Sequence, residues 1–147
     1  MKIIGLASDH AGYELKEYVK TYLTAKGIEF VDYGTHNTDS CDYPDFAGPA
    51  AKAVASGACD KGIVLCTTGI GVSIAANKIP GIRCALLSDL MSARLTREHN
   101  DTNVMALGAG VVGQMLALEI VDTWLTTEFS GGERHCRRIE KLMALEK

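Results

Sequence analysis

Short apolar runs alternate with longer amphipathic segments along the whole chain. Runs of five or six mostly apolar residues are typical of buried strands. They predict strands at 2–7, 28–33, 62–66, 83–87 and 103–107. The other segments carry apolar residues at helical spacing, as Leu15, Val19 and Leu23 do. They predict helices at 13–26, 46–55, 72–78, 89–99, 113–127 and 134–146.

This alternation predicts a fold class. Strands followed by helices at intervals of about 25–30 residues indicate βαβ units and a parallel sheet. No low-complexity stretch or linker-like change of composition divides the chain, so we expect one domain over residues 1–147. The expected architecture is an α/β/α sandwich with a five-stranded, parallel, Rossmann-like sheet. Ligands of such sheets bind beyond the carboxyl ends of the strands, so the loops there are the candidate sites.

Composition and charge narrow the class of protein. Hydrophobic residues make up 47% and charged residues 22%, which is typical of a globular protein. The net charge of −3 and the lack of a basic stripe argue against nucleic-acid binding. No apolar run reaches the roughly 18–20 residues of a membrane span. The five cysteines lack C-x-x-C spacing, so no disulfide framework or zinc site is expected, and a reducing cytoplasm is the expected location.

The loop after the first strand carries a carboxylate and an imidazole beside a predicted helix start. Its sequence is Ser8-Asp9-His10-Ala11-Gly12. This combination suits binding of a sugar hydroxyl or a phosphate. The alternative is that Ser8 or Asp9 only caps the helix.

The loop after the third strand places a thiol at a strand tip, before a glycine-rich turn that opens a helix. It reads Cys66-Thr67-Thr68-Gly69-Ile70-Gly71-Val72-Ser73. A helix N-terminus can lower a thiol pKa from about 8.5 towards neutrality. The pattern therefore suits a thiolate that carries a proton or attacks a substrate, beside an oxyanion cradle. A buried structural cysteine is the alternative. A dinucleotide fingerprint would need glycine in place of Ile74.

Cationic residues mark two further candidate positions. His99 closes a predicted helix, where the helix dipole favours its protonated form. Arg134 and Arg138 are four residues apart, share a helix face and could together hold a phosphate. A surface histidine at a helix end and a solvated basic helix face are the alternative interpretations.

Taken together, these loops resemble the type B ribose-5-phosphate isomerases and the related galactose-6-phosphate and allose-6-phosphate isomerases. The resemblance runs from residue 1 to about residue 146 and depends on six short motifs in a fixed order. The motifs are Ser8-Asp9-His10-Ala11-Gly12, Asp42-Tyr43-Pro44, Cys66-x-Thr68-Gly69-x-Gly71-x-Ser73-x-Ala75-Ala76-Asn77-Lys78, Gly81-Ile82-Arg83, Arg97-Glu98-His99-Asn100-Asp101 and Gly131-Gly132 with Arg134-His135.

The resemblance implies an aldose–ketose isomerase that acts through a cis-enediolate. Ribose 5-phosphate is the expected substrate. The alternatives are allose or galactose 6-phosphate, or a sugar-phosphate-binding module without catalysis. The resemblance implies Cys66 as the base that moves a proton between C2 and C1, and His99 as the group that opens the sugar ring. The enediolate is expected to be held by Thr68, together with Thr67, Gly69, Ile70, Gly71 and Ser73. The sugar hydroxyls are expected to contact Asp9, Tyr43 and Asn100, and Asp9 also assists ring opening. The phosphate is expected to contact His10, Arg134 and Arg138.

The resemblance also bears on cofactors and partners. The implied chemistry needs no metal or organic cofactor. Members are dimers or dimers of dimers with active sites shared across the dimer interface, so a homodimer or homotetramer is expected. In such an assembly His99 and the C-terminal arginines serve the Cys66 of a partner subunit. The apolar face of the helix at about 134–146 would then dock on that partner; the alternative is that it packs on its own domain.

Three positions depart from the family pattern. Thr67 stands where many members have glycine, and Gly110 stands where many have an arginine that helps to bind phosphate. Glu133 is an additional residue that brings a negative charge close to the expected phosphate. Arg137 is an extra cation that could replace the missing arginine. These departures concern the substrate more than the type of reaction.

Overall fold

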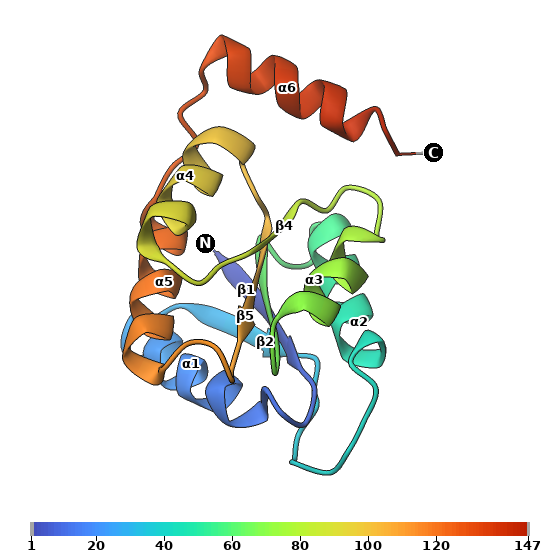
Figure 1. The fold of residues 1–147 in the computed structure, drawn as a ribbon, viewed down its shortest axis with the longest axis vertical. Coiled ribbons are helices and arrows are strands. Elements are labelled where there is room, and N and C mark those ends of the chain that lie inside the picture. Colours follow the sequence, from blue (N-terminus) through green and yellow to red (C-terminus); the bar gives the residue numbers. More distant parts are fainter. Residues whose placement is uncertain (1, 147) are drawn as a thin grey trace.

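The computed structural model describes residues 2–146 and contains every predicted element, with boundaries displaced by at most three residues (Figure 1). The strands are β1 Ile3–Ser8, β2 Glu29–Asp32, β3 Lys61–Cys66, β4 Cys84–Leu86 and β5 Val104–Gly108. The helices are α1 Tyr13–Ala25, α2 Pro44–Ala55, α3 Ile70–Asn77, α4 Leu90–Asn100, α5 Gln114–Thr126 and α6 Glu133–Met143.

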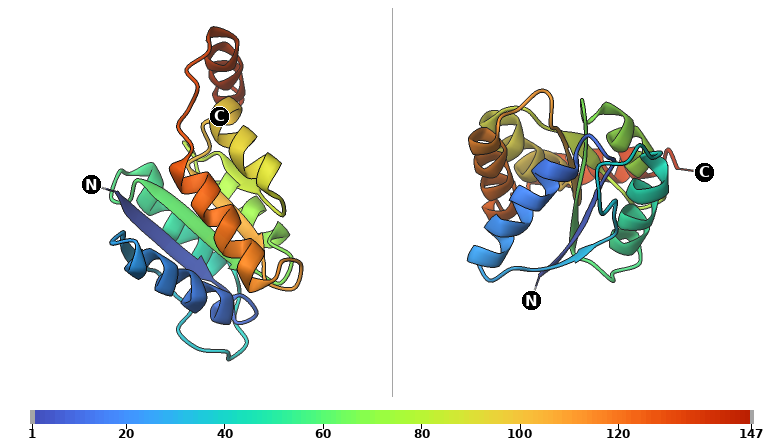
Figure 2. Two further views of the ribbon diagram at one scale, coloured as in Figure 1. Left: turned by 90° about the vertical axis from the view of Figure 1, so that its left-hand side faces the viewer. Right: turned by 90° about the horizontal axis from the view of Figure 1, so that it is seen from below.

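The five strands form one parallel sheet in the order β2-β1-β3-β5-β4. Helices α1, α4 and α5 cover one face, and α2 and α3 cover the other (Figure 2). The predicted α/β sandwich is therefore confirmed. The order places β5 between β3 and the short edge strand β4, so the chain passes beyond the position of β5 and then returns to it.

The two faces of the sheet have different cores. The face under α1, α4 and α5 holds large side chains, among them the fully buried Leu23, Ile120 and Trp124. The Trp124 indole N–H donates to Thr102 Oγ1 at 3.0 Å, so its one polar group is satisfied. The opposite face is rich in alanine from α2 and α3. The central strands are buried on both faces, which explains their continuous apolar sequences.

Helix α6 lies apart from the rest of the subunit, across the end of the molecule where α4 ends (Figure 1). Glu146, just after this helix, accepts a hydrogen bond from the Gly81 N–H at 2.9 Å. A cavity of about 420 Å³ lies between the end of α6 and the body. Leu142 and Leu145 are 46% and 73% exposed, so the subunit does not bury the apolar side of its own last helix.

Among residues 2–146, no helix is both long enough and apolar enough to cross a lipid bilayer.

Candidate active site

Cys66 is the last residue of β3, and the chain turns directly into α3 after it. Its side chain is almost fully buried, and the Gly69 N–H donates to Sγ at 3.2 Å. Gly69 has a φ of +79°, and a Cβ there would lie 2.5 Å from Leu86 Cδ1, so glycine is required. An N–H directed at the sulfur stabilises negative charge on it. The first N–H groups of α3 lack intrahelical acceptors and add to the positive potential.

The end of β5 holds this turn in place. The Ala109 N–H donates to the Cys66 carbonyl and the Gly110 N–H to the Thr67 carbonyl, both at 2.8 Å. A Cβ at Gly108 would lie 2.5 Å from the Thr68 carbonyl oxygen, so the two segments are in direct contact. The Thr68 hydroxyl accepts from the Ile70 N–H at 3.2 Å. The hydroxyl therefore lies at the start of α3, on the exposed side of the turn.

Asp9 lies beside Cys66 at the same, carboxyl end of the strands. Ser8 is in register with Leu65, and the Asp9 N–H donates to the Leu65 carbonyl at 3.2 Å. Asp9 Oδ1 accepts from the Gly12 N–H at 3.0 Å, which closes the turn before α1; Gly12 itself is the N-cap residue and α1 has no side-chain cap, so neither Ser8 nor Asp9 caps this helix. The second carboxylate oxygen leaves Asp9 a further acceptor in addition to this contact.

His10 and Tyr43 complete this group of predicted site residues. His10 Nδ1 accepts from the Cys41 N–H at 3.3 Å, which fixes the imidazole against the segment before α2. The Tyr43 ring packs on Gly71, where a Cβ would lie 2.7 Å from Cζ. The structure thus brings Asp9, His10 and Tyr43 to the carboxyl end of β3.

The remaining predicted residues form a second group at the end of α4. The rings of His99 and His135 are stacked, with centroids 4.4 Å apart and planes 10° apart. A cavity of about 330 Å³ beside them is also lined by Asn100 and Arg138. Burial, followed by the neighbouring His99 and two arginines of α6, lowers the pKa of His135. Arg134 is on the same helix turn but does not line this cavity.

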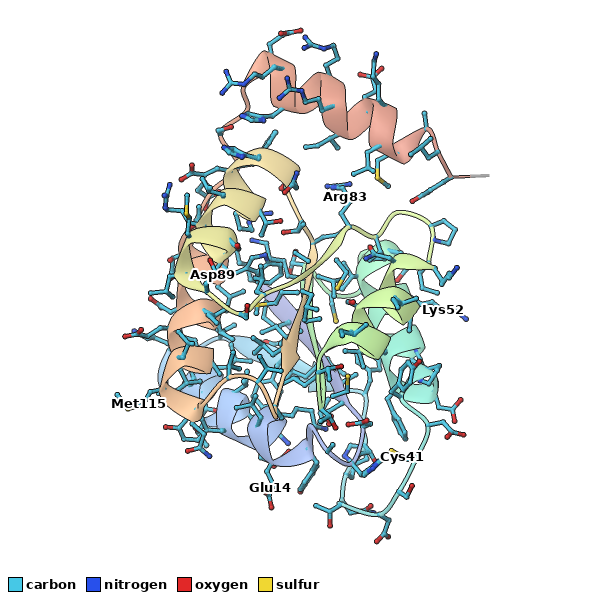
Figure 3. The ribbon with its side chains drawn as sticks, viewed as in Figure 1. Glu14, Cys41, Lys52, Arg83, Asp89 and Met115 are labelled. Carbon is cyan, nitrogen blue, oxygen red and sulfur yellow. The ribbon has the colours of Figure 1, made fainter. Side chains whose placement is uncertain are left out.

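The two groups lie at opposite ends of the parallel strands. The Cys66 group lies at the carboxyl ends, and the His99 group lies at the amino ends. Cys66 is in register with Gly108 at the end of β5, whereas α4 ends just before β5 begins. The five residues of β5 span roughly 13 Å of strand. Figure 3 shows this separation through two labelled neighbours: Cys41 lies near the lower end of the molecule, and Arg83, which donates to the Asn100 carbonyl at 2.9 Å, lies far above it, just below α6. One subunit therefore does not bring Cys66 and His99 together.

Two features near the second group were not foreseen from the sequence. His135 belongs to a quoted motif, but its stacking on His99 joins two helices and could not be inferred from local spacing. Arg137, the possible replacement for a missing phosphate contact, instead pairs with Glu133 at 2.8 Å. The extra acidic residue and the extra basic residue thus neutralise each other on the exposed side of α6.

Comparison with known proteins decides the family. The ribose/galactose isomerase family model matches residues 4–142. The chain belongs to this family. Ribose-5-phosphate isomerase B of Escherichia coli is 48% identical over 146 residues, covering 99% of this chain and 97% of the relative. D-erythrulose-4-phosphate isomerase of Pectobacterium atrosepticum is 44% identical, covering 90% and 88%.

A solved structure agrees with this isomerase along almost its whole length. Ribose-5-phosphate isomerase B of Clostridium thermocellum superposes with a TM-score of 0.96 at 55% identity, covering 98% of this chain and 97% of that one. The expectation of an aldose–ketose sugar-phosphate isomerase is thereby confirmed at the level of the family.

Proposed function

We propose that this isomerase interconverts ribose 5-phosphate and ribulose 5-phosphate through a cis-enediolate. The observation that carries the proposal is the Cys66 thiol at the end of β3, held at 3.2 Å by the Gly69 N–H at the start of a helix. Two relatives of similar length are named ribose-5-phosphate isomerase B, which favours the five-carbon sugar.

In this mechanism Cys66 is the base. Its thiolate removes the proton from C2 of the open-chain aldose, the hydroxyl proton moves from O2 to O1, and the thiol returns its proton to C1, which gives the ketose with no net change in atoms. Negative charge develops on the O1 and O2 side of the enediolate during this transfer. The Thr68 hydroxyl stabilises that charge together with those N–H groups of residues 67–71 that are not bonded to Cys66 Sγ or to the Thr68 hydroxyl, and one such donor contributes about 3 kcal/mol. Ser73 lies one helix turn further on, where its hydroxyl donates to the Ile70 carbonyl at 2.7 Å and holds the cradle.

Ring opening and phosphate binding come from the second group. His99 takes the proton of the anomeric hydroxyl and delivers it to the ring oxygen as the bond between C1 and that oxygen breaks, with Asp9 assisting. Asn100 and Tyr43 bind hydroxyl groups of the open chain. His10 approaches the phosphate from one side, and Arg134 and Arg138 approach it from the other. The Cys66 group and the His99 group lie at opposite ends of the strands within one subunit, so the complete site needs two copies of the chain.

The assembly that we propose is therefore a homodimer or a homotetramer with shared sites. The exposed apolar residues of α6 and the exposed Leu86 and Met91, near the β4 edge, are the surfaces available for a second copy. Residues 1–147 form one sugar-phosphate isomerase domain, and α6 docks on the partner subunit. This arrangement carries His99 and the C-terminal arginines to the Cys66 of that partner.

Turnover of a panel of sugar phosphates tests this proposal. The purified protein is assayed with ribose 5-phosphate, allose 6-phosphate, galactose 6-phosphate and D-erythrulose 4-phosphate, with a chelator present. We expect the highest kcat/KM with ribose 5-phosphate. Turnover of another sugar alone would keep the reaction and change the substrate. Binding of these sugars without turnover would overturn the proposal in favour of a binding module.

A further inference from the structure

Lys16 of α1 is fully buried although it carries an ammonium group. Its Nζ donates to Asp32 Oδ1 and to the Thr35 carbonyl oxygen, each at 2.5 Å. The Tyr13 ring covers the ammonium, with its centroid 5.6 Å from Nζ. Burial lowers the pKa of Lys16, and the bond to Asp32 opposes that shift. A buried charge is tolerated only when it is paired in this way, so the two acceptors and the ammonium depend on one another.

These acceptors belong to the segment that continues the sheet beyond β2. Asp32 is the last residue of β2 and also accepts from the Gly34 N–H at 2.8 Å. The Gly34 carbonyl accepts from the Ser8 N–H, and the Thr35 N–H donates to the Ser8 carbonyl, both at 2.8 Å. The ammonium is thus connected through two hydrogen-bonded steps to the residue that precedes Asp9.

The same segment leads to two other site residues. After Thr35 the chain reaches Cys41, whose N–H donates to His10 Nδ1 at 3.3 Å. Two residues later, the Tyr43 ring packs on Gly71. Within residues 2–146, the Lys16 Nζ hydrogen bonds run only to Asp32 and Thr35. The hydrogen bonds of the Lys16 ammonium therefore act on the site through this segment.

We propose that Lys16 is a positioning residue, which holds residues 8–10 and 35–43 in the arrangement that presents Asp9, His10 and Tyr43 to the substrate. This inference builds on the proposed function of the site. The Cys66 turn is fixed separately by β5 and α3. Loss of the ammonium should therefore impair substrate binding more than the proton transfer itself.

The test compares three variants with the wild type. Lys16→Met fills the same space without the ammonium. Lys16→Met combined with Asp32→Asn removes both charges, so it avoids an unpaired buried carboxylate and keeps the protein folded. Lys20→Met is the matched control, because Lys20 also donates to Asp32, at 3.1 Å, but its side chain is 26% exposed and makes no bond to Thr35. Each variant is characterised by thermal unfolding, by kcat and KM, and by amide hydrogen exchange.

We expect the double variant to regain thermal stability relative to Lys16→Met while its KM for ribose 5-phosphate stays raised about tenfold, since misplacing binding groups by an ångström can cost up to roughly a hundredfold. Amide exchange over residues 33–43 should accelerate in both Lys16 variants and remain unchanged over residues 66–77. Lys20→Met should behave like the wild type. A purely structural role would instead lower the fraction of active enzyme, and so the apparent kcat, with KM unchanged.

Two results separate the failures. If the wild type isomerises none of the sugar phosphates, the proposed function fails, and the exchange measurement still tests the role of Lys16. If exchange over residues 33–43 and KM both match the wild type in the double variant, the role of Lys16 is overturned while the proposed function stands.

Discussion

Thr67 and Gly110 are in direct contact beyond the carboxyl ends of β3 and β5, beside Cys66. The Gly110 N–H donates to the Thr67 carbonyl at 2.8 Å, and a Cβ at Gly110 would lie 3.2 Å from both Thr67 Cγ2 and the Thr67 carbonyl oxygen. These two residues were noted separately in the sequence as departures from the family pattern. Their contact indicates that they are linked: the Thr67 methyl group occupies the space that a side chain at position 110 would enter.

This contact predicts a non-additive pair of substitutions. Gly110→Arg adds a cation on the phosphate side of the site, but its Cβ crowds Thr67, so we expect little change in KM for ribose 5-phosphate. With Thr67→Gly present as well, the methyl contact is removed and only the contact with the backbone oxygen of residue 67 remains, so KM should fall by up to about tenfold, which corresponds to roughly 1.4 kcal/mol. Steady-state kinetics of both single variants and the double variant measures the coupling. Additive effects would contradict the contact as its cause.

The separation of Cys66 from His99 predicts complementation between inactive subunits. In the proposed homodimer, the Cys66→Ala and His99→Ala variants should each be nearly inactive. Co-expressed with different affinity tags, they form mixed dimers that hold one intact site, built from the Cys66 of one chain and the His99 of the other. A statistical mixture should recover about a quarter of wild-type activity, because half of the dimers are mixed and each has one working site of two. No recovery in purified mixed dimers would refute shared sites.

The two arginine environments on α6 predict different kinetic effects. Arg134→Ala should raise KM for ribose 5-phosphate about tenfold or more, because a hydrogen bond to a charged group contributes about 1.5–3 kcal/mol. The kcat should change less. Arg137→Ala is the matched control, since this guanidinium is already paired with Glu133, and KM should stay within about twofold of the wild type. An equal rise in both variants would mean that only the overall charge of the helix matters.

Asp32 predicts how acid affects stability. Burial raises the pKa of its carboxyl, but hydrogen bonds from Lys16, Gly34 and Lys20 outweigh burial and hold that pKa below its usual value. A carboxyl with a lowered pKa in the folded state stabilises the protein above its unfolded pKa of about 3.9, and the contribution disappears as pH falls through the folded pKa. The difference in free energy of unfolding between the wild type and Asp32→Asn should therefore be constant above about pH 5 and shrink below about pH 4. Urea unfolding at several pH values measures it, and a constant difference down to pH 3 would count against this assignment.

Much of the fold follows from local sequence patterns. The runs that form β1, β3 and β5 are apolar apart from Ser8 and Lys61 at their ends, because both faces are buried. The thiol before a glycine-rich turn at 66–71 is likewise local, so this part of the candidate site was predictable. The position of β5 between β3 and β4 was not predictable, because helical connections of similar length allow either order of β4 and β5.

Contacts between distant segments account for what the sequence did not predict. Lys16 follows the apolar Leu15 and would ordinarily be read as a solvated lysine. It is buried because Asp32 and Thr35 arrive from the next strand to pair with it. The His135 ring stacks on the His99 ring because the start of α6 lies against the end of α4. Neither contact leaves a periodic pattern in the sequence.

Replacement of Cys66 tests the central claim most directly. Turnover of ribose 5-phosphate by the wild type is compared with that of Cys66→Ala, with circular dichroism to check the fold and calorimetry to measure sugar-phosphate binding. We expect kcat to fall by at least about a hundredfold, the lower end of the loss on removing a general base, while fold and binding are kept. Near-wild-type turnover by a folded Cys66→Ala variant would contradict the role of Cys66 as the base.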